Sequence, residues 1–185
     1  GNRESRKYVT ADISKRYSDI EYMIIPNQNN KYSSLERFAV TKFDLNNILV
    51  YDNDIKKQNL LNAFDGNSRQ TFGGNSHFTL NLSDTVTDEV LCVDNTMFQF
   101  IKGKNVTVLF VPTDADLSNL PEKYRNPDCL LIDTVPENFD FISCNTVIFS
   151  GSEKQFKKNY DSIKEISPTV ISTSERNITV NLNGG

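Results

Sequence analysis

The stretch that decides the fold class of this chain is Met23-Ile24-Ile25-Pro26-Asn27-Gln28-Asn29-Asn30-Lys31-Tyr32-Ser33-Ser34-Leu35. Its three consecutive apolar residues predict a central strand that is covered on both faces. The Asn/Gln run ends the strand, because short polar side chains compete for backbone hydrogen bonds. Ser33 and Glu36 then form a capping-box pattern for a helix around residues 34–44. In an open α/β sheet, the loop after such a strand is a usual place for a ligand site.

The composition is that of a soluble globular protein. The chain has 185 residues, 37% hydrophobic and 24% charged, which is long enough for one domain with a substantial core. We therefore expect residues 1–185 to form a single domain. No run reaches the roughly 18 to 20 apolar residues that cross a bilayer. The net charge of −4 argues against strong non-specific binding to a nucleic-acid backbone, but it is compatible with a local basic patch.

The three cysteines lie inside apolar segments. Their odd number and the lack of C-x-x-C spacing argue against a disulfide framework and against a zinc knuckle. We expect them to be buried small hydrophobic residues: Cys92, Cys129 and Cys144.

The first third of the chain alternates helical and extended patterns. Residues 4–18 predict an amphipathic helix with a basic outer side, residues 47–51 a second buried strand, and residues 54–64 another helix. The order strand, helix, strand, helix is typical of a parallel sheet with crossover helices.

The remainder of the chain predicts mostly strands. Residues 97–101 and 106–111 flank the turn Lys102-Gly103-Lys104-Asn105, so we expect an antiparallel hairpin there. Ser152 and Gln155 form a second capping box. The other expected elements are strands at 78–82, 90–93, 129–133 and 145–149, a short helix at 118–124, a helix after Ser152 that buries Phe156, Tyr160, Ile163 and Ile166, and a closing hairpin of residues 170–173 and 178–182.

This order of elements resembles the later three-quarters of a metallo-β-lactamase fold, an α/β fold of mixed sheets flanked by helices. It is most similar to the carboxy-terminal domain of ComEC-type competence proteins, which are membrane proteins associated with DNA uptake. The first strands of that family, with a glycine-rich opening, have no counterpart here.

In the family, a loop of T-H-x-H-x-D-H type follows an apolar triplet like Met23-Ile24-Ile25. The resemblance places Asn27 and Asn29 at the first two histidine positions, Lys31 at the aspartate and Tyr32 at the third histidine.

Two later family motifs also have counterparts. An L-F-T-G-D-A-type motif with a metal-bridging aspartate resembles Leu109-Phe110-Val111-Pro112-Thr113-Asp114-Ala115-Asp116, in which Asp114 is the match. A D-V-L-K-V strand followed by H-H-G resembles Asp128-Cys129-Leu130-Leu131-Ile132 followed by Asp133-Thr134-Val135.

The family's chemistry needs metal ions that activate water, and zinc is held by several imidazoles with carboxylates or thiolates. This chain has one histidine, His77, which we expect at the surface or at a sheet edge. Asparagine is a poor metal ligand, and Lys31 would place a positive charge beside an incoming cation. We therefore predict no catalytic residue, no cofactor and no working metal site, only vestigial positions: Asn27, Asn29, Lys31, Tyr32, Asp114 and Asp133.

An alternative is a magnesium-dependent hydrolase that uses Asp114, Asp116 and Asp133 as oxygen ligands. We favour the simpler interpretation that these aspartates cap turns or stay solvated. Gly151-Ser152 opens a helix where an anion could bind, but capping by Ser152 is the favoured role. There is no G-x-S-x-G nucleophile elbow.

The resemblance implies a catalytically inactive, pseudo-hydrolase domain with a binding or scaffolding role. We expect it to be part of a longer bacterial membrane protein, on the outer side of the membrane. The expected partners are DNA, through the basic faces of the first and last helices, or the membrane-embedded part of the same protein. No small-molecule ligand is expected. The alternative is a stand-alone α/β interaction protein unrelated to DNA uptake.

Overall fold

The computed structural model describes residues 11, 13, 15, 19–25, 33–51, 68–72, 74–94, 96–113, 115–174 and 178–183. The chain divides into two compact units, residues 1–73 and 74–185. Residues 11, 13 and 15 of the helix predicted at 4–18 are helical. The loop Pro26–Tyr32 and the helix predicted at 54–64 lie outside the described residues.

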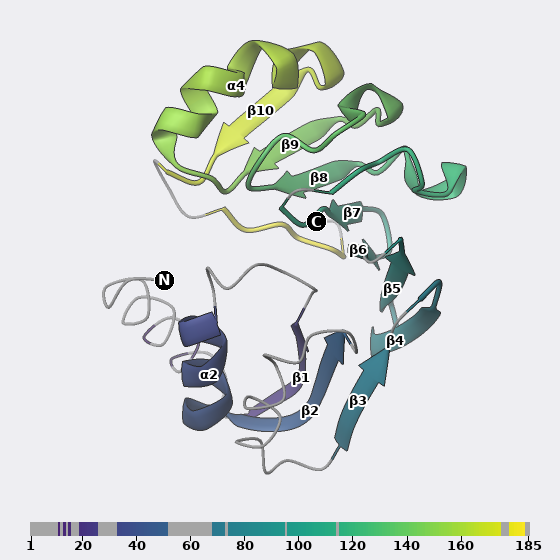
Figure 1. Cartoon of the computed structure of the whole chain (residues 1–185), viewed down its shortest axis with the longest axis vertical. Helices are drawn as coiled ribbons and strands as arrows, with labels where there is room; N and C mark the ends of the chain where they lie inside the picture. Colours follow the sequence, from purple (N-terminus) through teal and green to yellow (C-terminus); the bar gives the residue numbers. More distant parts are fainter. Residues whose placement is uncertain are drawn as a thin grey trace. The chain divides into compact units, whose positions relative to one another are not determined.

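The first unit contains a three-stranded parallel sheet. It is built from β1 (Asp19–Ile25), α2 (Ser33–Lys42), β2 (Asp44–Tyr51) and β3 (Ser68–Phe72), with strand order β1-β2-β3 (Figure 1). The prediction of two parallel strands joined by a helix is confirmed. The prediction that Met23-Ile24-Ile25 form a central strand covered on both faces is wrong, because β1 is an edge strand in which only Ile25 is buried, and β2 is the central strand. Strand β3 was not expected from the sequence. The core of this unit consists of Ile25, Val40, Leu45, Ile48 and Val50.

The second unit contains a seven-stranded mixed sheet in the order β10-β9-β8-β7-β6-β5-β4 (Figure 1). Strands β4 to β7 pair antiparallel, which confirms the predicted hairpin of β6 and β7, and β7 to β10 pair parallel. The strands are β4 (His77–Ser83), β5 (Val86–Val93), β6 (Thr96–Lys102), β7 (Thr107–Phe110), β8 (Cys129–Ile132), β9 (Thr146–Phe149) and β10 (Thr169–Ser172).

One face of this sheet is covered by α4 (Glu153–Ile166) and by the connections between strands. Ile163 is fully buried in this core, and Phe156 and Ile166 pack against it, as predicted. Tyr160 was expected to be buried but is 39% exposed, because only its edge rests on the ring of Phe156. The helix predicted at 118–124 is only the 3-10 turn η3 (Glu122–Tyr124), since Pro121 has no N–H for a longer helix.

The opposite face is covered in part by residues 178–183, which we call the C-terminal segment. Its three apolar residues, Ile178, Val180 and Leu182, pack against buried Val108, Cys129 and Ile148. The closing hairpin predicted for this region is wrong. Strand β10 pairs with β9, and no described residue of the C-terminal segment lies in a strand. The alternating apolar side chains of the segment instead pack onto the face of the sheet.

Gly103 lets the C-terminal segment approach the β6–β7 turn. A Cβ at this position would overlap the carbonyl oxygen of Leu182 and lie 2.8 Å from its carbonyl carbon. The next residue, Lys104, donates its backbone N–H to the Leu182 oxygen at 3.0 Å. Only glycine therefore leaves room for the segment at this turn.

The three cysteines are buried and free, as predicted. Burial raises the pKa of each thiol, to about 11 for Cys129. Within the part of the chain that the structure describes, no helix is both long and apolar enough to cross a membrane.

Candidate functional site

The carboxyl ends of β7 and β8 lie side by side, because the two strands are parallel neighbours. The chain continues this pairing beyond both strands: the Val111 N–H donates to the Leu131 carbonyl at 3.0 Å, and the Glu137 N–H donates to the Ala115 carbonyl at 2.9 Å. The segments that follow β7 and β8 therefore lie next to each other at the carboxyl end of these two strands, and the predicted positions Asp116 and Asp133 lie on these segments.

Asp133 directly follows β8 and is half-buried. The hydroxyl of Thr113 lies 2.9 Å from its Oδ1 and 2.7 Å from its Oδ2, and the hydroxyl of Thr134 lies 3.4 Å from Oδ1. Neutral hydroxyl donors thus contact this carboxylate. Asp114, the neighbour of Thr113, lies outside the described residues.

Asp116 caps a turn, as predicted. Its Oδ1 accepts the Ser118 N–H at 2.9 Å and the Asn138 side-chain amide at 2.7 Å. The bond from the Ser118 backbone, followed by the bond from Asn138, lowers the pKa of this carboxyl group. Asp116 therefore ties the chain after β7 to the loop after β8.

The single histidine lies at the other end of the same sheet. His77 starts β4, its side chain is 46% exposed, and its Nε2 lies 3.2 Å from Oε2 of Glu89. The prediction of a sheet-edge histidine is confirmed. Since β4 is four strands from β8 and neighbouring strands are about 4.8 Å apart, His77 and Asp133 are roughly 19 Å apart across the sheet. One metal ion cannot bind both.

Glu89 on β5 is the centre of a polar cluster that no sequence motif indicated. The hydroxyl of buried Tyr124 donates to its Oε2 at 2.6 Å, and Nζ of Lys123 lies 3.8 Å from the same oxygen. The Tyr124 hydrogen bond is the main cause of the lowered pKa of Glu89. Tyr124 also packs edge-on against Phe100, with ring centroids 5.1 Å apart. The cluster fixes η3 to the sheet.

Asp88, the neighbour of Glu89, is buried on the opposite face of β5, with 3% of its surface exposed. Gln99 donates its side-chain amide to Oδ2 at 3.0 Å, whereas Oδ1 has no hydrogen-bond partner among the described residues. Burial raises the pKa of this carboxyl group. The Asp88 side chain is buried against the sheet and does not reach the segments that follow β7 and β8.

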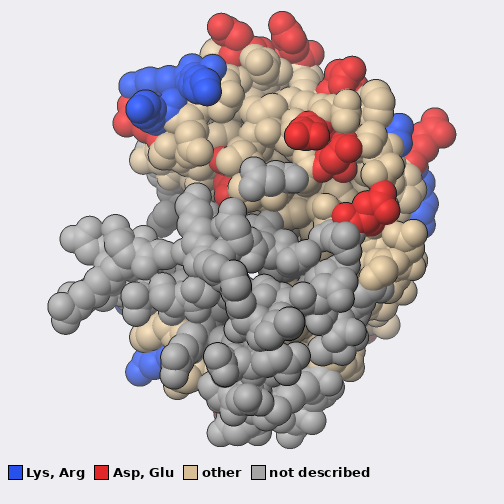
Figure 2. All heavy atoms as spheres, viewed as in Figure 1, with Lys and Arg blue, Asp and Glu red and all other residues tan. Residues whose placement is uncertain are grey.

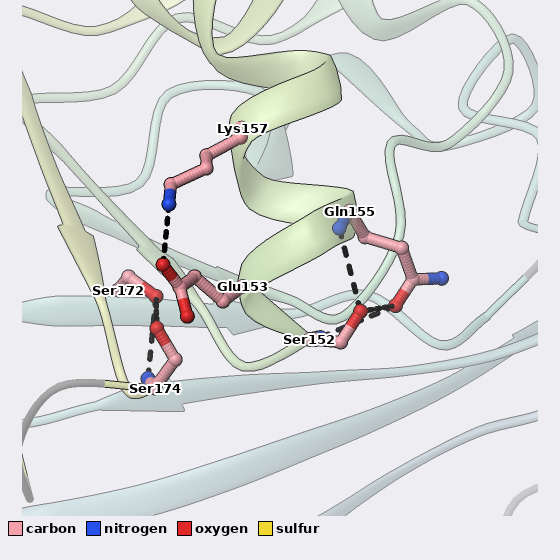
Figure 3. Close-up of polar contacts among 6 residues, drawn as sticks. All are labelled: Ser152, Glu153, Gln155, Lys157, Ser172 and Ser174. Carbon is pink, nitrogen blue, oxygen red and sulfur yellow. Dashed lines mark hydrogen bonds and ion pairs between the residues drawn. The ribbon is translucent and has the colours of Figure 1, made fainter.

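The amino end of α4 is closed by its own cap, as predicted. Figure 3 shows the hydroxyl of Ser152 accepting the Gln155 N–H at 3.3 Å, while the Ser152 N–H donates to Oε1 of Gln155 at 3.2 Å. Glu153 in the first turn of α4 forms an ion pair with Lys157, one turn further along the helix (Figure 3). The capping box satisfies the donors that would otherwise attract an anion.

Sequence reasoning also missed a groove between the loop after β8 and the last turns of α4. Its volume is about 600 Å³. The two walls come from residues 135–143 and 162–166, so no continuous motif could have indicated it. The lining residues are Val135, Asn138, Phe139, Asp140, Ile142, Ser143, Ser162, Glu165 and Ile166.

Within the described ranges, no group of three or more His, Cys, Asp or Glu side chains could hold a metal ion. The vestigial positions Asn27, Asn29, Lys31, Tyr32 and Asp114 lie outside those ranges, so their arrangement stays a prediction.

No known family model matches the sequence, and no curated protein matches it. Among solved structures, the chain is similar to the metallo-β-lactamase fold protein YhfI from Bacillus subtilis, with a TM-score of 0.58. The match covers 93% of this chain and 80% of that chain at 12% sequence identity. The fold is metallo-β-lactamase-like. The mixed seven-stranded sheet with α4 on one face agrees with the fold class predicted from the sequence.

Proposed function

We propose that this chain is a catalytically inactive metallo-β-lactamase-like domain. It serves as a binding or scaffolding module of a ComEC-type membrane protein associated with DNA uptake, on the outer side of a bacterial membrane. The observation that carries the loss of activity is the position of His77, the only histidine, which contacts Glu89 at the far end of the sheet from Asp133. A zinc centre needs several imidazoles gathered at one place.

The residue types at the remaining family positions support the same proposal. Asn27 and Asn29 offer neutral amides, Tyr32 offers a phenol, and Lys31 would repel a cation. Asp133 accepts hydrogen bonds from Thr113 and Thr134. This donor set does not fit a dinuclear metal centre.

Metal analysis of the purified protein is the direct test. After incubation with zinc or manganese and removal of excess metal, we expect far less than one ion per chain and no phosphodiesterase activity. Asp133→Ala and the control Asp161→Ala, an exposed position on α4, should behave alike in both assays. Stoichiometric bound metal, with activity that is lost on chelation and in Asp133→Ala alone, would contradict the proposal.

The charge of residues 74–185 helps to choose between the two expected partners, DNA and the membrane-embedded part of the same protein. Residues 74–185 carry fifteen Asp and Glu against nine Lys and Arg. Figure 2 shows a group of basic side chains over one end of α4, whose lysines include Lys154, Lys157 and Lys158, and a few more at the opposite margin of the view. Since this unit is net acidic and Lys157 is paired with Glu153, we favour the membrane-embedded part over DNA as the partner of residues 74–185.

Binding to short duplex DNA at several salt concentrations tests this preference. We expect weak binding that Lys154→Ala/Lys158→Ala changes less than threefold. Tight binding with a steep fall in affinity as salt rises, abolished by that double variant, would instead identify DNA as the partner, because such a fall reports counterion release from phosphates.

A further inference from the structure

The groove beside α4 combines an apolar floor with an exposed rim. Phe139 and Ile142 are 8% and 3% exposed at the floor, and Val135 and Ile166 are partly buried beside them. Asn138, Asp140, Ser143 and Glu165 are exposed. The volume of about 600 Å³ lies within the range of roughly 300 to 1,000 Å³ that is typical of ligand sites.

The loop wall of the groove is held in a defined shape. Asn138 has a left-handed backbone, with φ of 52°, and its side-chain amide donates to Asp116 at 2.7 Å. The 3-10 turn η4 (Phe139–Phe141) follows, and the Ser143 N–H donates to the Arg125 carbonyl at 3.0 Å. A wall that is ordered before binding lowers the entropic cost of association.

The electrostatic character of the groove is negative. Its two charged lining residues, Asp140 and Glu165, are both acidic, and neither side-chain carboxylate has a hydrogen bond or ion pair within the described part of the chain. Figure 2 shows acidic side chains over the carboxyl end of α4 and the loops beside it.

Two cations on neighbouring segments already have contacts, and the Arg125 guanidinium lies over the Phe141 ring, 5.2 Å from its centroid. Arg125 donates to the carbonyl oxygens of Leu120 and Ser118, and the Lys164 ammonium donates to the carbonyl of Pro168. Among the described residues, neither cation pairs with Asp140 or Glu165.

We propose that this groove binds an extended peptide segment of a partner protein in which basic residues alternate with aliphatic ones. Successive side chains of an extended chain point to opposite sides. The aliphatic side chains would contact Phe139, Ile142 and Ile166 at the floor. The basic side chains would pair with Asp140 and Glu165 at the rim. Phe141, which is 42% exposed, lies next to the floor with the Arg125 guanidinium over its ring. The site does not depend on whether the fold has lost its metal chemistry.

The test is titration of the whole chain with a blocked tetrapeptide of alternating arginine and leucine, followed by backbone amide NMR. We expect shifts confined to residues 138–143 and 162–166 and much weaker binding of the matching glutamate–leucine peptide. Asp140→Asn and Glu165→Gln should each weaken binding about fivefold, the order of factor that one close charge pair gives in water.

A double variant outside the groove provides the control, because it changes the net charge by as much as Asp140→Asn and Glu165→Gln do together. Glu122→Gln/Asp161→Asn alters two exposed acidic residues outside the groove and should bind the peptide as the parent does. Equal weakening in this control and in the Asp140→Asn/Glu165→Gln double variant, equal binding of the acidic peptide, or shifts centred elsewhere on the chain would overturn the proposal. All four positions are exposed and the replacements are isosteric, so the amide spectrum of each variant verifies its fold.

Discussion

Replacing Gly103 by alanine should detach the C-terminal segment from the β6–β7 turn. A Cβ there would overlap the Leu182 carbonyl oxygen, with 2.8 Å to the carbonyl carbon and 2.9 Å to the Leu182 Cβ. These neighbours are mostly backbone atoms, which cannot rotate away as the end of a long side chain can. The segment itself must therefore move.

The expected cost combines two losses and one gain. The Lys104–Leu182 hydrogen bond contributes about 1 kcal/mol, and partial exposure of the Leu182 side chain costs about 1 kcal/mol more. Against these, alanine reduces the entropy of the unfolded chain, which stabilises the protein by about 0.5 kcal/mol. The variant should thus lose about 1.5 kcal/mol of unfolding free energy.

Urea denaturation measures this loss, and hydrogen exchange of the Lys104 amide locates it. In a chain that ends at residue 177, the same substitution should be neutral or slightly stabilising, because the obstructing carbonyl is gone. If Gly103→Ala is as stable as the parent and the Lys104 amide keeps its protection, the segment does not lie against the turn as described.

Three further predictions concern polar side chains. Ser152→Ala removes the cap of α4 and should cost about 1 kcal/mol in thermal denaturation, whereas Ser152→Asp should retain most of the stability; equal losses would contradict the capping role. Burial raises the pKa of Asp88, so as the pH falls from 7 through that raised pKa the parent should gain stability relative to Asp88→Asn. Urea unfolding of parent and variant between pH 7 and pH 4 measures this difference in unfolding free energy, and a difference that stays constant would refute the prediction. Asp128 accepts the backbone N–H and the hydroxyl of Thr107, each at 2.8 Å, and these bonds lower its pKa. Asp128→Ala should therefore lower the free energy of unfolding by about 2 kcal/mol at pH 7. The difference from the parent should shrink as the pH falls through the lowered pKa of Asp128, because the protonated carboxyl group is a weaker acceptor. A difference that does not change with pH would argue against this hydrogen bonding.

Most strands could be predicted because burial on both faces leaves an uninterrupted apolar run. This holds for β2, β8 and β9, which lie inside their sheets. Strand β3 was missed because its sequence, Ser-Arg-Gln-Thr-Phe, carries little apolar character. As an edge strand it is held by its ladder with β2. The alternating C-terminal segment was assigned to a hairpin, because alternation alone does not tell which surface the apolar side chains will contact.

The candidate sites depended on contacts between distant parts of the chain. The sequence placed Asp133 at the end of a strand, yet its partner Thr113 lies twenty residues away. The Glu89–Tyr124 pair spans thirty-five residues. Such contacts follow from strand order, which a local pattern does not encode. The turn-capping role of Asp116 was predictable, because its acceptor bonds the backbone only two residues on.

The buried cysteines make the protein convenient for site-specific labelling. Thiolates are the reactive species, and burial keeps Cys92, Cys129 and Cys144 in the thiol form, 1%, 5% and 6% exposed. A single cysteine introduced at exposed Asp140 or Asp161 would react with a maleimide dye long before the native three. Fluorescent reporters can therefore be attached beside the α4 groove, or away from it, in the otherwise unaltered chain.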